Sequence, residues 1–264
     1  MIALYIYVAV LGAVIGSFLN VCIYRIPQEE SIVKPPSHCM ACSSRLKVLD
    51  LIPVLSYLFL RGRCRYCAVK ISPRYAFVEV LTAIIFILCF WKYGISIEFV
   101  ASVFLLSILI AVFFTDLDHK IIPNEYVIIG LSGGTLLFLY NLFNRVSFYG
   151  DRYWYSPLLG VAVGSGFLIL VAITGYLVYR SDEAMGMGDI KIMAPIGLFL
   201  GWKLSVVTLL TAVLLGGLVS IVLLLFKVVN RKDTVPFGPF IVTGAFVALL
   251  WGWDFIYWYI GMVI

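Results

Sequence analysis

The chain consists mainly of long apolar runs separated by shorter polar segments. A helix needs about 20 apolar residues to cross the hydrocarbon core of a bilayer. The first run has no basic start, and its length favours a span over a signal peptide. We therefore predict an all-α, polytopic membrane protein with about eight transmembrane helices, the sixth of them short. The runs are residues 3–24, 76–93, 97–115, 124–143, 156–178, 190–202, 204–226 and 237–262.

Composition and charge support this interpretation and orient the chain. Of the 264 residues, 63% are hydrophobic and 12% are charged, whereas soluble domains carry roughly 25% charged residues. With the N-terminus outside, 15 of the 19 Lys and Arg residues fall in the inner loops, as the positive-inside rule requires. Basic loops beside a membrane usually set orientation. We thus expect membrane lipid around the chain and no nucleic-acid partner.

One substantial polar segment, residues 25–75, separates the first two runs. It holds nine of the 19 basic residues and four of the six cysteines. Within it, Val48–Leu60 is apolar but broken at Pro53, so we expect it to lie against the bilayer surface or to pack on the helices. The sequence thus predicts three parts: a first transmembrane helix (1–24), a cytoplasmic cysteine loop (25–75) and a transmembrane bundle (76–264).

The four cysteines of the loop form two CxxC pairs, Cys39/Cys42 and Cys64/Cys67, separated by 21 residues. Two such pairs are typical of a tetrahedral structural zinc site. The alternatives are two disulfides or free thiols, and disulfides rarely persist in the cytoplasm. His38 adjoins the site but would be a fifth ligand. The remaining cysteines, in apolar runs, are expected to be packing residues: Cys22 and Cys89.

Aspartates follow the third run and open the sixth. Asp116 and Asp118 lie in Thr115-Asp-Leu-Asp-His-Lys-Ile-Ile-Pro-Asn124, and Asp189 lies in Gly186-Met-Gly-Asp. The predicted topology puts both segments on the cytoplasmic side. Because Asp116 and Asp118 are two residues apart, they point to different faces of a helix. A catalytic pair therefore needs one carboxylate from each segment.

Two carboxyl groups held close together cannot both ionise, so one can act as a base and the other as an acid. Gly186 and Gly188 would allow a tight turn and close approach of an extended peptide. The alternative is that these aspartates are interfacial charges at helix ends.

Two further polar residues lie in spans. Glu79 is either a buried acid or part of an interfacial pair with Arg74, and Asn20 predicts close helix packing with a hydrogen bond.

Taken together, these motifs resemble the type IV prepilin peptidases, also called prepilin leader peptidase/N-methyltransferases. The resemblance covers nearly the whole chain, and the order of the motifs is specific. They are Gly16-Ser-Phe-Leu-Asn-Val-Cys-Ile-Tyr-Arg-Ile-Pro27, Pro35-Pro-Ser-His-Cys39, the two CxxC pairs, Asp50-Leu-Ile-Pro53, Arg61-Gly-Arg-Cys64, Ile71-Ser-Pro-Arg-Tyr75 with Glu79, Asp116–Asn124 and Gly186–Lys191.

The resemblance implies an aspartic endopeptidase of the bacterial inner membrane that cuts the leader of prepilins or pseudopilins, in type IV pilus assembly or protein secretion, after a glycine at the cytoplasmic face. It implies Asp116 and Asp189 as the catalytic pair and Asp118 as an accessory residue. It also implies N-methylation of the new N-terminus with S-adenosylmethionine. One departure is Met40, where family members often have proline. Because no G-x-G-x-x-G loop occurs, no residue is assigned to the methyl donor.

Three other classes of function are compatible with individual motifs. A presenilin-like or signal-peptide-peptidase-like protease also uses GxGD, but the paired CxxC motifs argue against it. An ion-coupled transporter would use aspartates near the membrane midplane, often with paired repeats, and here they lie at helix ends without a convincing repeat. The third is a non-catalytic assembly protein that binds partners through a zinc module.

Overall fold

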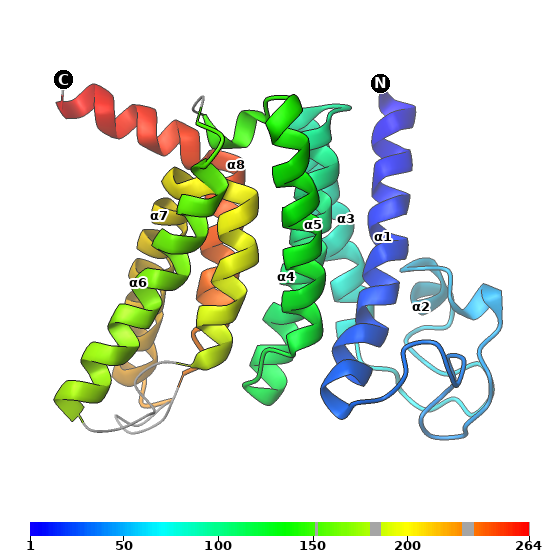
Figure 1. Ribbon diagram of the computed structural model, residues 1–264. Helices are drawn as coiled ribbons and strands as arrows, with labels where there is room; N and C mark the ends of the chain where they lie inside the picture. The colour runs from blue at the N-terminus through cyan, green and yellow to red at the C-terminus, as the bar shows by residue number, and fades with distance from the viewer. Residues whose placement is uncertain (151–152, 180–185, 229–234, 264) are drawn as a thin grey trace. The chain divides into compact units, whose positions relative to one another are not determined.

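The computed structural model describes residues 1–150, 153–179, 186–228 and 235–263, and its regular elements are all helical (Figure 1). Seven of these helices are long and apolar enough to cross a membrane, which confirms the predicted all-α, polytopic fold. The elements are α1 (Ile2–Arg25), η1 (Ile26–Gln28), η2 (Val48–Asp50), α2 (Leu55–Phe59), α3 (Arg74–Tyr93), α4 (Ile97–His119), α5 (Asn124–Phe143), η3 (Ser147–Tyr149), α6 (Ser156–Tyr179), α7 (Met187–Leu225) and α8 (Gly238–Val263).

The chain forms two compact units, Met1–Ile95 and Ser96–Ile264. In the first unit, α1 and α3 pack antiparallel, and the glycines of α1 let the backbones approach closely. A Cβ on Gly16 would lie 2.8 Å from Cα of Glu79. Further along the pair, the Asn20 side-chain amide donates to the carbonyl oxygen of Tyr75 at 3.0 Å. The hydrogen bond predicted from the lone polar residue of the first span is therefore present.

The second unit contains the longest element, α7, which is a helical hairpin. Its 39 residues include Gly201 at φ 71° and ψ 176°, a conformation that is essentially restricted to glycine. Figure 1 shows the chain reversing there, so α7 covers both the sixth and the seventh predicted run. The Tyr149 hydroxyl donates to the carbonyl oxygen of Leu198 at 3.0 Å, which satisfies one of the carbonyls freed at the break.

Small residues bring the first half of α7 against α5 and α6. A Cβ on Gly160 of α6 would lie 2.3 Å from the carbonyl oxygen of Gly197, and one on Gly130 of α5 would lie 2.8 Å from Cβ of Pro195. Such close backbone approach is the usual way in which helices associate inside membranes. This packing fixes the position of the helix start that carries Asp189.

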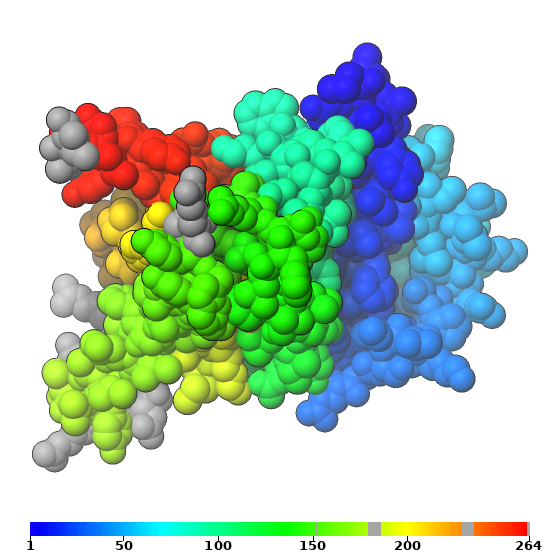
Figure 2. Space-filling model, turned by 45° about the horizontal axis from the view of Figure 1, so that its top comes forward, coloured from blue at the N-terminus to red at the C-terminus, as the bar shows by residue number. Residues whose placement is uncertain are grey.

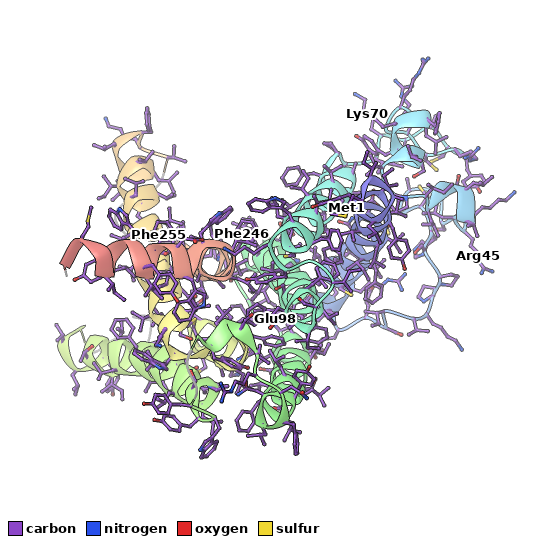
Figure 3. The ribbon with its side chains drawn as sticks, turned by 90° about the horizontal axis from the view of Figure 1, so that it is seen from above. Met1, Arg45, Lys70, Glu98, Phe246 and Phe255 are labelled. Carbon is purple, nitrogen blue, oxygen red and sulfur yellow. The ribbon has the colours of Figure 1, made fainter. Side chains whose placement is uncertain are left out.

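η3, which follows α5, packs against other helices of the second unit at the end opposite to the aspartates. Phe148 and Tyr149 are buried, and the Trp253 indole N–H donates to the carbonyl oxygen of Phe148 at 3.0 Å. Glu98 at the start of α4 accepts from the backbone N–H of Ser147 at 3.0 Å; the labelled Glu98 can be found in Figure 3. These contacts join η3 to the start of α4 and to the middle of α8, at the end of α4 opposite to Asp116.

Candidate active site and metal centre

Asp116 lies in the last turn of α4 and is buried, with 5% of its surface exposed. The helix ends three residues later, because Lys120 adopts a left-handed conformation and its N–H bonds back to the Asp116 carbonyl. The carboxylate of Asp116 accepts a hydrogen bond from the backbone N–H of Gly238, at the start of α8. An N–H at a helix start is a favourable donor to a carboxylate.

Asp189 lies in the first turn of α7, where 8% of its surface is exposed. The charge of Asp116 acts on Asp189, so residues 73 positions apart in the sequence are brought within electrostatic reach. The helices that carry them belong to the same unit. The arrangement therefore unites one carboxylate from each of the two predicted segments, and buries both.

Side chains near the aspartates connect the turn after α4 with the starts of α7 and α8. A Cβ on Gly188 would lie 3.0 Å from Cβ of Ile122, and one on Gly238 would lie 3.4 Å from Cδ1 of the same isoleucine. The Lys191 ammonium donates to the Asn124 side-chain oxygen at 3.0 Å. The turn between α4 and α5 thus contacts the starts of both α7 and α8.

The accessory residues predicted around the pair differ in their placement. Asp118 is exposed while Asp116 is buried, as the two-residue spacing on a helix predicts. Gly186 precedes α7 at φ −65° and ψ 127°, so the turn does not need the left-handed freedom of glycine. The small size of glycine is needed here, because a Cβ on Gly186 would lie 2.8 Å from Oδ2 of Asp189.

Gly238 is the residue at the pair that the sequence analysis missed. The sequence signal is Pro236-Phe-Gly-Pro239, a break at the start of the last apolar run, on the predicted side of the aspartates. A Cβ on Gly238 would lie 2.5 Å from Oδ2 of Asp116 and 3.1 Å from its Cγ. Any side chain here would have to displace the carboxylate.

We expect Gly238→Ala to lower catalysis by the aspartate pair far more than it lowers stability. The obstructing atoms are the end of a rotatable side chain, so the stability loss should stay below about 1 kcal/mol. A misplacement of about 1 Å can cost on the order of 100-fold in rate, and we expect a loss of that size. Steady-state kinetics and thermal unfolding of the purified variant would measure the two effects.

Gly217→Ala in α7 is the matched control, because a Cβ there meets nothing within 4 Å. It should leave both rate and stability near those of the wild type. Equal losses in the two variants would mean that helix glycines matter only generally, and that Gly238 has no special relation to Asp116.

The first unit holds the four cysteines of the polar loop close together. Their Sγ atoms all lie within 4.8 Å of one another, and those of Cys39 and Cys67 are 3.9 Å apart. Tetrahedral zinc with Zn–S bonds of 2.3 Å places sulfur atoms about 3.8 Å apart. The four side chains therefore fit a single metal ion, and none of them forms a disulfide.

Both CxxC motifs have the same backbone conformation, with counterparts 25 residues apart, as Cys39 and Cys64 are. Ser43 and Ala68 have φ of 55° and 56°. The structure thus reveals a short repeat that the side chains concealed, and it places two similar turns around one centre. Figure 3 labels Arg45 and Lys70, which belong to the first and the second turn. The matched N–H···O bonds are Cys39 to Ser44 and Cys64 to Val69, Ser43 to Cys39 and Ala68 to Cys64, and Leu46 to Ser37 and Ile71 to Gly62.

Local hydrogen bonds favour the thiolate form of two of the four cysteines. Bonds from the side chain and backbone of Ser44 lower the pKa of the Cys42 thiol to about 6. The backbone hydrogen bond of Val69 lowers the pKa of the Cys67 thiol, but desolvation and hydrogen bonds with the neighbouring thiols outweigh it and raise this pKa to about 12. Backbone N–H groups of Tyr66 and Cys67 lower the pKa of the Cys64 thiol. The thiolate is the form of cysteine that binds metals. His38 bonds to the carbonyl oxygen of Pro36.

Asp50 holds the second CxxC turn in place. Its carboxylate, only 3% exposed, pairs with Arg65 and accepts from the Tyr66 hydroxyl at 2.9 Å and from the backbone N–H of Lys47 at 3.0 Å. Burial raises the pKa of Asp50, but these hydrogen bonds outweigh it and hold the pKa below its ordinary value. Arg65 and Tyr66 are the two residues between Cys64 and Cys67.

These features define a class: a multi-pass membrane protein with two buried aspartates at one end of a helix bundle and a four-cysteine centre in a separate unit. The chain belongs to the prepilin leader peptidase/N-methyltransferase family. Residues 10–93 match the bacterial Peptidase A24 N-terminal domain, and residues 103–221 match the type IV leader peptidase family. The two matched regions lie in the two structural units, one in each. This membership decides against the transporter and presenilin-like alternatives.

Relatives with the name prepilin leader peptidase/N-methyltransferase align along most of the chain. The protein from Pseudomonas putida is 34% identical over 92% of this chain and 89% of its own length. The protein from Bacillus subtilis (strain 168) is 34% identical over 97% of each chain. A third, from Myxococcus xanthus (strain DK1622), is 39% identical over 83% of this chain, and the alignment covers 63% of that relative. No solved structure shows a significant match.

Proposed function

We propose that this protein is a membrane aspartic endopeptidase that removes the leader of prepilin-like proteins after a glycine, with Asp116 and Asp189 as its catalytic pair. The observation that carries the proposal is the burial of these two carboxylates together at one end of the second unit. Membership in a family of leader peptidases supplies the substrate class. Asp118, Gly186 and Gly188 have accessory roles at the edges of the pair.

The proposed chemistry uses two buried carboxyl groups, Asp116 and Asp189, that interact electrostatically. They cannot both carry a charge at close range, so they share a proton. The charged member takes a proton from water as the water attacks the scissile carbonyl, and the protonated member donates a hydrogen bond to the carbonyl oxygen. The Gly238 N–H, bonded to Asp116, favours the charged form of that residue. We therefore assign Asp116 as the base and Asp189 as the acid.

The first unit has a separate role in this proposal. Cys39, Cys42, Cys64 and Cys67 hold a structural zinc ion, which supplies folding energy to a loop with little core of its own. We associate this loop, residues 25–75, with N-methylation of the newly exposed residue by S-adenosylmethionine, an activity that the names of the relatives include. The distribution of Lys and Arg supports an N-terminus outside the inner membrane and aspartates at the cytoplasmic face.

The proposal is tested by incubating the purified protein in detergent with a synthetic prepilin segment that contains its leader. We expect a single cut after the glycine, followed by methylation of the new N-terminus when S-adenosylmethionine is added, both followed by mass spectrometry. The matched control is the same peptide with its glycine replaced by valine, which should remain intact. Cleavage of both peptides at other positions would contradict a leader peptidase.

A further inference from the structure

A stretch of the cysteine loop, Val48–Leu60, exposes mainly apolar side chains. Val48 and Phe59 are 81% and 83% exposed, and Leu58 is 62% exposed. Its polar groups are turned inward: Asp50 pairs with Arg65, and the Tyr57 hydroxyl donates to the carbonyl oxygen of Ile71. The side of the segment away from the unit is therefore apolar, which is unusual for a loop in water.

The centre of this segment is a strained turn. Val54 has φ 62° and ψ −51°, and the N–H of Leu55 bonds to the carbonyl oxygen of Pro53 at 2.6 Å. These values describe the classic γ-turn, which is rare and costly, and more so for a β-branched residue. Such a conformation persists only when its surroundings hold it.

The carboxylate of Glu79 in α3 stabilises the Val54 turn. Its Oε2 accepts from the backbone N–H of Val54 at 2.7 Å, and the carboxylate also bonds with the Ser17 side chain of α1. Glu79 is 8% exposed and bonds to the turn. Of the two interpretations that the sequence leaves for Glu79, the structure shows the buried acid, with the Val54 N–H as a specific partner.

This bond also fixes the level of the segment along α3. Glu79 is five residues beyond Arg74, where the membrane-length helix begins, so it lies roughly 7 Å along the helix axis. The Pro53–Leu55 turn must lie at the same level, beside α3. In Figure 1, α2 lies at a level between the two ends of α1. In Figure 2 the segment is drawn in light blue, bordering α1.

Backbone and charge are both suited to that depth. A segment that leaves water must satisfy its own N–H groups, and those of Leu51, Val54, Leu55, Ser56, Leu58 and Leu60 all have acceptors. The segment is flanked by exposed basic residues, Lys47, Arg61 and Arg63. Basic groups next to an apolar face attract anionic lipid headgroups.

We propose that Val48–Leu60 is inserted in the plane of the bilayer interface among anionic lipids, and that Glu79 sets its depth through the Val54 turn. Apolar faces of interfacial helices lie about 5–10 Å into the headgroup boundary, which agrees with the level of Glu79. The segment thereby tethers the cysteine loop to the bilayer through its own apolar face, independently of which reaction the protein catalyses.

The test places the photoreactive residue p-benzoylphenylalanine at Leu58 or Phe59 of the full chain, in vesicles of phosphatidylethanolamine and phosphatidylglycerol. Met40 is the matched control, because it is also apolar and 62% exposed but lies inside the first CxxC turn. After illumination, we expect several-fold more lipid adduct at Leu58 and Phe59 than at Met40. Equal yields, or cross-links to a second copy of the chain instead of lipid, would overturn the proposal.

The role of Glu79 is tested in the same labelled protein. Glu79→Gln keeps a carbonyl acceptor for the Val54 N–H and should preserve the lipid adduct at Leu58, whereas Glu79→Leu removes it and should reduce the adduct several-fold. Equal adducts in both variants would disprove the anchoring role. Should Glu79→Leu fail to fold, the comparison of Leu58 and Phe59 with Met40 still decides whether the segment is inserted.

Discussion

Replacing Asp189 or Asp116 by asparagine is expected to abolish leader cleavage while the helix bundle stays folded. Asparagine matches aspartate in shape but neither accepts nor releases a proton, and general acid–base catalysis contributes about 10²–10⁴-fold for each group. A thousandfold loss corresponds to about 4 kcal/mol of transition-state stabilisation. Because the pair is buried, losing a charge there should not lower stability. Initial rates on the synthetic prepilin and thermal unfolding measure both effects.

Two other aspartates provide controls of graded severity. Asp118→Asn changes an exposed residue two positions from Asp116, and we expect a smaller loss, as suits an accessory residue. Asp254→Asn lies in α8, far along the helix from Gly238, and should leave cleavage unchanged. Near-normal cleavage by Asp116→Asn or Asp189→Asn would refute the assignment of the pair and would require another catalytic group.

Much of the fold could be predicted from the sequence, because the bilayer forces each spanning segment to satisfy its own backbone as an apolar helix. The sixth and seventh runs were separated at Lys203, two residues after the real break at Gly201. The charged Lys203 indicated the break in the apolar sequence, although the backbone conformation of Gly201 causes it. The nearness of Asp116 and Asp189 followed from counting spans, since segments on the same side of a membrane can meet.

Other features depend on contacts that no local pattern reveals. Gly238 is one glycine among 22, and only its distance from Asp116 gives it meaning. Val54 is a β-branched residue in a left-handed turn, the opposite of what its type predicts, because Glu79 holds it from α3. α3 packs with α1 in the first unit, a pairing that the hydropathy of residues 76–93 does not reveal.

Cys64→Ser is expected to release the metal and unfold the cysteine loop, yet leave leader cleavage within a few-fold of the wild type. Structural zinc contributes about 10–16 kcal/mol of binding free energy in small domains, and serine is a poor replacement for a thiolate. Cys64 is 5% exposed, and its Sγ accepts from the backbone N–H of Tyr66. Elemental analysis and limited proteolysis of residues 25–75 would follow the loss. Methyl transfer should fail because the loop that we associate with it is unfolded. Peptide cleavage should continue because both aspartates lie in the second unit.

Cys89→Ala separates a metal effect from a general cysteine effect, since Cys89 is fully buried in α3 and takes no part in the four-cysteine centre. It should keep one zinc ion per chain and both activities. Unchanged zinc in Cys64→Ser would refute the metal centre. Loss of cleavage and methylation together, with zinc lost, would instead show that the peptidase pair depends on a folded cysteine loop, so the two units could not be assigned one reaction each. The pattern across the two variants therefore measures how far the division of the chain at residues 95 and 96 is also a division of function.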